Sequence, residues 1–193
     1  MLSGSTLKRS SLSTLTAAVL AAVMVTPCLA ARIPDPKPEV VRLLPVGPEV
    51  KDWEVYPDTL VYASGNDLTE IYDGAFELYT KNGVLDAASQ MYRRGDDTAT
   101  VTIHRMDSVR SAVRFFEYWR RPDRKQSSFR PLNVPTRAYV YSNEGATSGR
   151  HYRDRYFVTV ETYVSGGKGA EDAEGFMRSI SKKIGGRKTR SAA

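Results

Sequence analysis

Hydrophobic residues recur every three or four positions in three segments of the chain, a spacing that places them on one face of a helix. These segments are residues 66–81, 108–119 and 170–184. Asn66 or Asp67 can cap the start of the first helix, and Asn82-Gly83 can end it. Asp107 or Ser108 can cap the start of the second helix. The predicted core positions are Leu68, Ile71, Tyr72, Ala75, Leu78 and Tyr79, then Val109, Ala112, Val113 and Phe116, then Ala173, Phe176, Met177, Ile180 and Ile184.

Alternation of apolar and polar residues predicts four strands, arranged as two β-hairpins. Residues 84–93 and 98–105 form the first hairpin, and residues 137–142 and 151–164 form the second, each around a glycine-containing turn. The resulting order is α-ββ-α-ββ-α. It predicts an α+β fold with a mainly antiparallel four-stranded sheet and about three helices packed on one face.

The first thirty residues have the pattern of a signal peptide. Lys8 and Arg9 precede an apolar run that ends in small side chains at Cys28 and Ala30. A retained membrane anchor is the alternative. It would need about 20 uninterrupted apolar residues, and this run contains serine, threonine and proline. We therefore expect export to the periplasm or the extracellular space, with cleavage near Ala30.

Cys28 is the only cysteine of the chain, so a disulfide framework and a cysteine-based zinc site are both excluded. A lipidated cysteine usually has leucine three residues before it and a small residue directly before it. Val25 and Pro27 occupy these positions, so the sequence does not favour a lipoprotein. Cleavage after Ala30 leaves a cysteine-free mature chain.

The mature chain is expected to hold a proline-rich spacer at residues 31–50, a single domain at residues 51–184 and a basic disordered tail at residues 185–193. The spacer residues that could lie on the surface of the domain are Val40, Val41, Leu43 and Leu44. The formal net charge is +6, but residues 31–181 hold 21 basic and 22 acidic residues. The excess charge lies at the two ends, so it does not favour nucleic-acid binding.

Residues 120–137 form an arginine-rich loop between the second helix and the third strand. Arginine beside aromatic rings is suited to phosphate, carboxylate or sulfate groups, including those of lipids and glycans. The candidate binding residues are Trp119, Arg120, Arg121, Arg124, Lys125, Phe129, Arg130 and Arg137, with Arg150, Arg153 and Arg155 supplied by the second hairpin. The alternative is a solvated loop whose arginines pair with acidic residues.

The sequence shows no catalytic, cofactor or phosphate-loop motif. Its two histidines, His104 and His151, have no nucleophile at a recognisable spacing. Glu70, Asp73 and Glu77 share one helix face, but no further ligand is spaced to complete a metal shell; Glu77 is expected to pair with Lys81. No catalytic residue, metal or cofactor is therefore predicted.

Several segments resemble an exported bacterial family known only as a domain of unknown function. They are Leu43-Leu44-Pro45, Trp53, residues 66–79 and Met106-Asp107. The likeness covers most of residues 43–184, with departures at Phe76 and Gly83-Val84. It implies an exported single domain and no particular activity. The positions that match the motif of the family are Asp73, Gly74, Glu77 and Tyr79.

Gly74 falls within the first predicted helix, where glycine costs about 1 kcal/mol relative to alanine. The sequence predicts that it allows close packing of a neighbouring backbone, with a ligand contact as the alternative.

These observations favour an exported, non-catalytic binding or accessory protein of the cell envelope. The expected partner is an anionic ligand, a glycan, a lipid surface or an envelope protein. An extracytoplasmic hydrolase with a dispersed site is the alternative function.

Overall fold

The computed structural model describes residue 34 and residues 36–72, 74–123, 130–134, 136–143, 145–164 and 168–186. The strands are β1 (Glu54–Val55), β2 (Val61–Ser64), β3 (Val84–Arg94), β4 (Asp97–Met106), β5 (Arg130–Val134), β6 (Thr136–Asn143), β7 (Ala146–Arg153) and β8 (Tyr156–Tyr163). The helices are α1 (Glu39–Leu43), α2 (Phe76–Lys81), α3 (Val109–Asp123) and α4 (Gly169–Gly185), with 3₁₀ turns η1 (Gly47–Glu49) and η2 (Gly65–Glu70). Some predictions lie outside the described residues. They are the predicted signal peptide, the last seven residues of the tail, and the candidates Asp73, Arg124, Lys125 and Phe129.

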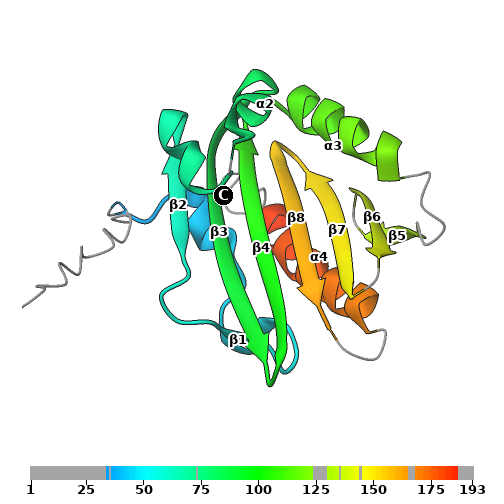
Figure 1. The fold of residues 1–193 in the computed structure, drawn as a ribbon. Coiled ribbons are helices and arrows are strands. Elements are labelled where there is room, and N and C mark those ends of the chain that lie inside the picture. The colour runs from blue at the N-terminus through cyan, green and yellow to red at the C-terminus, as the bar shows by residue number, and fades with distance from the viewer. Residues whose placement is uncertain are drawn as a thin grey trace, which may run out of the picture.

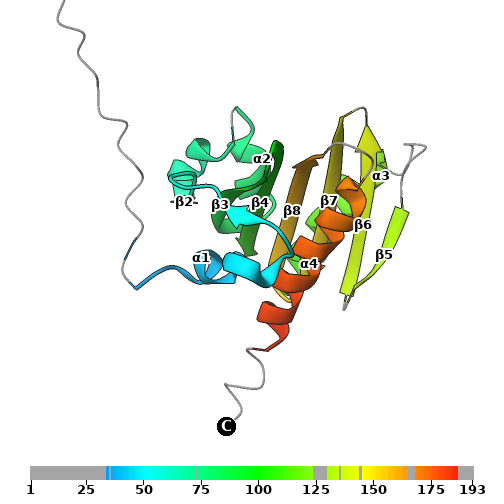
Figure 2. The same ribbon diagram turned by 90° about the horizontal axis from the view of Figure 1, so that it is seen from below.

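The fold is α+β, and the described strands form one antiparallel sheet of eight strands in the order β1-β3-β4-β8-β7-β6-β5, with β2 also paired to β3. Figure 1 looks onto the face that α2 and α3 cover at its upper end, with α4 behind the sheet. Figure 2 shows α1 and α4 together on the opposite face. No helix within the described residues is long and apolar enough to cross a membrane.

The prediction of four strands was wrong, because one turn without glycine or proline was missed and several strands are short. The predicted strand 151–164 is two strands, β7 and β8, joined by a turn at Asp154 and Arg155. Asp154 adopts a left-handed conformation with φ of 55°, which aspartate tolerates better than most residues. The first hairpin was predicted correctly, and its strands are β3 and β4.

The prediction of helices on one face was also wrong, because the central strands are apolar on both faces. In β4, the side chains of Val101 and Ile103 lie in one hydrophobic cluster and Met106 lies in another. In β8, Val158 belongs to the first cluster and Phe157 to the second. Both faces therefore need a covering layer, and helices supply it on each side.

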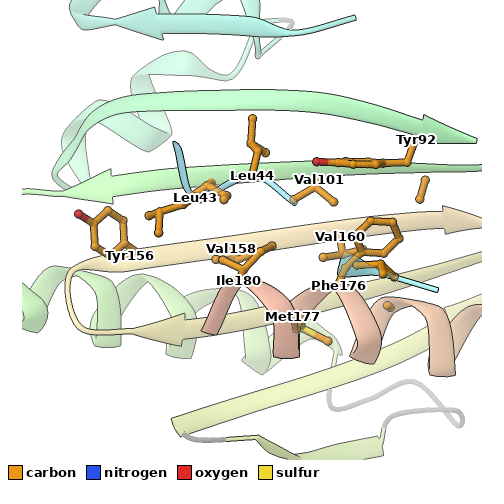
Figure 3. Packing of buried hydrophobic residues seen from close by; sticks show 14 of the residues in the cluster. Leu43, Leu44, Tyr92, Val101, Tyr156, Val158, Val160, Phe176, Met177 and Ile180 are labelled. Atoms are coloured by element: carbon orange, nitrogen blue, oxygen red, sulfur yellow. The ribbon is translucent and has the colours of Figure 1, made fainter. Parts of the chain in front are cut away.

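The larger cluster packs α4 and α1 against the sheet, as Figure 3 shows. All five residues predicted to face the core from α4 are buried. Val40, Leu43 and Leu44 are buried in the same cluster, so this part of the predicted spacer does not merely lie on the domain surface. Residues 39–43 form a short helix, because the prolines of this segment flank it and do not interrupt it.

The first predicted helix is divided into η2 and α2, with Gly74 between them in a left-handed conformation at φ of 68°. A Cβ atom at Gly74 would meet no neighbour within 4 Å, so the predicted packing role was wrong. The backbone conformation itself favours glycine at this position. The predicted stop at Gly83 is confirmed by its φ of 93°, and Ser108 caps α3 by accepting the Ser111 N–H at 3.1 Å.

Two positions predicted to be buried, Ala75 and Val109, are exposed, because each lies at or just before the start of a helix. The aromatic residue that α3 buries beside Phe116 is Phe115, which lies against Phe157 of β8 with ring centroids 5.0 Å apart.

A single carboxylate ties the chain before β1 and the first hairpin to α4. Asp172, whose side chain is 12% exposed, accepts the Trp53 indole N–H at 3.0 Å and two Arg94 N–H groups at 2.8 Å each. The Arg94 guanidinium lies 4.6 Å from the Trp53 ring centroid and also donates to Asp97 at 3.0 Å. Residues far apart in sequence are thus held at one point.

Replacing Asp172 with alanine is expected to lower the free energy of unfolding by about 2–3 kcal/mol, because the indole and guanidinium donors lose their acceptor in a largely buried place. Urea denaturation measures this change. Glu171→Ala is the matched control, since that carboxylate is exposed one residue away on the same helix. Equal stability of the two variants would show that the Asp172 contacts contribute little.

Candidate ligand-binding surface

An arginine–aromatic surface forms where the last turns of α3 lie beside β6 and β7. We define it as Glu117, Trp119, Arg120, Arg137, Tyr141 and Arg150. Helix α3 packs Phe115 and Phe116 onto the sheet, which brings its C-terminal half alongside these strands. Cross-strand pairing then places Arg150 of β7 opposite Tyr139 of β6, and Tyr141 lies two residues further along β6. Helix packing and strand register together assemble the surface.

Two arginines from different elements hold the Glu117 carboxylate. Arg120 donates from Nε at 2.8 Å and from Nη2 at 2.5 Å to Oε2, and Arg137 donates from Nη1 at 2.7 Å to Oε1. The Arg137 side chain is 60% exposed, whereas that of Glu117 is 25% exposed. One negative charge is therefore shared by two positive groups at the protein surface.

Arg150 lies deeper, with its side chain only 9% exposed. Its guanidinium carbon is 5.1 Å from the Trp119 ring centroid and 5.2 Å from that of Tyr141, both distances typical of cation–π contacts. Its Nη1 donates to the Tyr141 hydroxyl at 3.1 Å and lies 4.0 Å from a Glu161 oxygen. These contacts hold a largely buried positive charge against Trp119 and Tyr141.

An aromatic cluster continues from Trp119 to the motif residue Tyr79 on α2. The Tyr79 ring stacks on Tyr72 with centroids 3.6 Å apart, and it lies 5.6 Å from His104 and 6.4 Å from Trp119. Burial raises the pKa of both tyrosine hydroxyls. Three buried polar atoms of this cluster have no hydrogen-bond partner within the described residues: Tyr72 Oη, His104 Nε2 and Trp119 Nε1.

The predicted binding residues do not gather in one place. Arg120 and Arg137 meet at Glu117, but Arg130 extends towards α4, where it lies 4.0 Å from Glu174. Helices α3 and α4 cover opposite faces, so these arginines are separated by the sheet. Arg121 is exposed on α3.

Among the arginines of the second hairpin, Arg150 joins the surface, while Arg153 donates to the Ser181 carbonyl of α4 at 2.8 Å. Sequence reasoning missed Glu117 and Tyr141. The spacing of three residues between Glu117 and Arg120 is a local signal for Glu117, whereas no local spacing indicates Tyr141.

Two of the motif positions, Gly74 and Glu77, border a cleft of about 770 Å³ that Tyr72 and other residues of η2 and α2 also line. The expected Glu77–Lys81 ion pair is confirmed at 2.7 Å, and this hydrogen bond and charge lower the pKa of Glu77. The described residues contain no group of three or more histidine, cysteine, aspartate or glutamate side chains that could hold a metal ion.

The two histidines lie on opposite faces of the sheet and do not form a catalytic pair. His104 Nδ1 is 2.9 Å from the Phe157 carbonyl oxygen, and His151 Nδ1 is 3.2 Å from that of Arg137. Within the described residues, the Nε2 atom of neither ring has a hydrogen-bond partner. No described hydroxyl or carboxylate is therefore placed for these imidazoles to act on as a general base.

Comparison with known proteins shows similarity at the level of the fold. No family model and no curated protein matches the chain. A solved structure, the extracellular domain of PknH from Mycobacterium tuberculosis, matches with a TM-score of 0.50 at 12% sequence identity. The match covers 76% of this chain and 95% of that chain. The two proteins therefore share a fold.

The buried histidines predict a pH dependence of stability. Burial lowers the pKa of His104 and of His151 to about 4, whereas the unfolded value is about 6.5. The unfolded chain therefore binds more protons between these values. The contribution of each neutral, buried histidine to the free energy of unfolding is fully present above about pH 6.5. It is lost as the pH falls towards 4, by up to about 3 kcal/mol per histidine.

Urea denaturation from pH 7 to pH 4.5 tests this expectation. The variant with both His104→Gln and His151→Gln should lose less of its stability over this range than the wild type, whatever its stability at pH 7. An unchanged slope in the variant would show that these histidines do not govern the acid sensitivity.

Proposed function

We propose that this protein is an exported, non-catalytic binding or accessory domain of the bacterial cell envelope, and that its arginine–aromatic surface holds an anionic ligand. The observation that carries the proposal is the convergence of Arg120 and Arg137 on one carboxylate at the surface. Guanidinium groups held in this way present N–H donors in the geometry that carboxylate and phosphate groups accept.

The charge balance of this surface supports an anionic partner. Glu117 is shared by two arginines, and Arg121 adds an exposed positive charge on the same helix. Arg150 lies against the Trp119 ring, and the Glu161 carboxylate 4.0 Å away balances its charge. Since a long-range field attracts ligands of opposite charge, an anion would meet favourable electrostatics here.

Three observations support an extracytoplasmic location. The first thirty residues have the pattern of a signal peptide. The resemblance to an exported family of unknown function, in which we propose membership, points the same way. The similar fold of PknH is that of an extracellular domain, which suits a ligand-binding or accessory role outside the cytoplasm. The hydrolase alternative gains no support, because the described hydroxyls and carboxylates do not contact either imidazole.

Substitution of the exposed arginine tests ligand binding. Arg137→Ala is expected to weaken the binding of an anionic probe about tenfold, because a hydrogen bond to a charged group contributes about 1.5 kcal/mol or more. Calorimetric titration with inorganic phosphate, sulfate and citrate, at low and at physiological salt, measures the dissociation constant of each probe. Arg42→Ala, an exposed arginine on α1, is the matched control. Equal binding by both variants would rule out this surface as the binding site.

Export has a separate test. When the full chain is made in a bacterial host, the mature protein is expected outside the cytoplasm with Ala31 as its first residue, as determined by N-terminal sequencing. Full-length protein that stays in the cytoplasm would contradict the proposal of export.

A further inference from the structure

We infer that Glu117 is an internal substitute for the ligand, and that a phosphate monoester group displaces its carboxylate from Arg120 and Arg137. This inference rests on the proposed function and specifies its ligand. The site consists of the two guanidinium groups, and the carboxylate marks the place where an external oxyanion binds.

The geometry around Glu117 is that of a bound anion. Its Oε2 atom accepts two N–H groups of Arg120, and its Oε1 atom accepts one N–H group of Arg137. Arg120 belongs to helix α3 and Arg137 to strand β6, so the two arginines reach the carboxylate from different elements. Arg137 is further positioned by its own backbone, because its carbonyl oxygen lies 3.2 Å from His151 Nδ1.

The internal carboxylate can leave at little cost. The Arg137 side chain is 60% exposed, so its pairing with Glu117 is largely solvated. Ion pairs at such solvated positions contribute little to stability. A change of side-chain rotamer in Glu117 releases both arginines without movement of the α3 backbone. An external anion therefore competes with a weak internal partner.

The charges and donors favour a phosphate monoester over a single carboxylate. Two guanidinium groups carry two positive charges, and Glu117 supplies one negative charge. A phosphate monoester carries about −1.5 to −2 at neutral pH and presents three acceptor oxygens. Three N–H groups currently donate to Glu117, so the number of acceptors matches as well.

Glu174 on α4 provides a matched comparison. Its side chain is 24% exposed, close to the 25% of Glu117, and it also lies between two arginines. Its hydrogen bonds come from Arg178 of the same helix, whereas Arg130 remains 4.0 Å away. Within the described residues, Glu174 therefore accepts hydrogen bonds from its own helix alone and is not expected to occupy an anion site.

The test is a calorimetric titration of the mature protein with inorganic phosphate and with glycerol phosphate. Glu117→Gln removes the competing charge and keeps the size of the side chain. We expect it to bind phosphate about fivefold more tightly than the wild type, the factor that corresponds to about 1 kcal/mol. Glu174→Gln is expected to bind like the wild type, and adding Arg137→Ala to Glu117→Gln is expected to abolish the gain.

The outcomes separate this inference from the proposed function. If the wild type binds anions through Arg137 but Glu117→Gln gives no gain with inorganic phosphate, glycerol phosphate or phosphatidic acid vesicles, the inference is overturned and the proposed function stands. If neither protein binds any anion, both are overturned. An equal gain in Glu174→Gln would also overturn the inference, because the effect would then reflect net charge alone.

A parallel arm with vesicles containing phosphatidic acid identifies the source of the phosphate group. A gain on vesicles without one for glycerol phosphate indicates a lipid headgroup, whereas a gain for both indicates a soluble monoester. Either result supports the inference.

Discussion

The central strands of this protein are apolar on both faces, and this constraint shapes the rest of the structure. Val101 and Ile103 of β4 require cover on one side, while Met106 of β4 and Phe157 of β8 require it on the other. Burial of such side chains contributes about 1.5–3 kcal/mol each. One layer of helices could not satisfy both faces, so the helices divide between them.

The division of the helices also creates the candidate site. One face is covered by α4 together with α1, and the chain that follows α1 is fixed to the Asp172 carboxylate through Trp53. The other face is covered by shorter elements and by α3, whose C-terminal half lies beside β6 and β7. Glu117 and Trp119 are thereby brought to arginines of the sheet.

The contacts on this surface are ion pairs and cation–π contacts. Within the described residues, each imidazole donates from Nδ1 to a backbone carbonyl oxygen, whereas guanidinium groups meet a carboxylate and aromatic rings. The extracellular domain of PknH shares the fold of this protein.

The sequence by itself determined the elements that depend on local pattern. Helix α4, its five buried residues and the β3–β4 hairpin were predicted correctly, because periodicity and turn residues act over a few positions. The eight-stranded sheet, its two covered faces and the burial of Leu43 were decided by contacts between distant segments. The same holds for the site: residues 120–137 contain many arginines, but the sheet lies between Arg130, which is near α4, and Arg137, which contacts α3. Strand register and helix packing join residues that no local spacing connects, and that is why the tertiary structure alone places them.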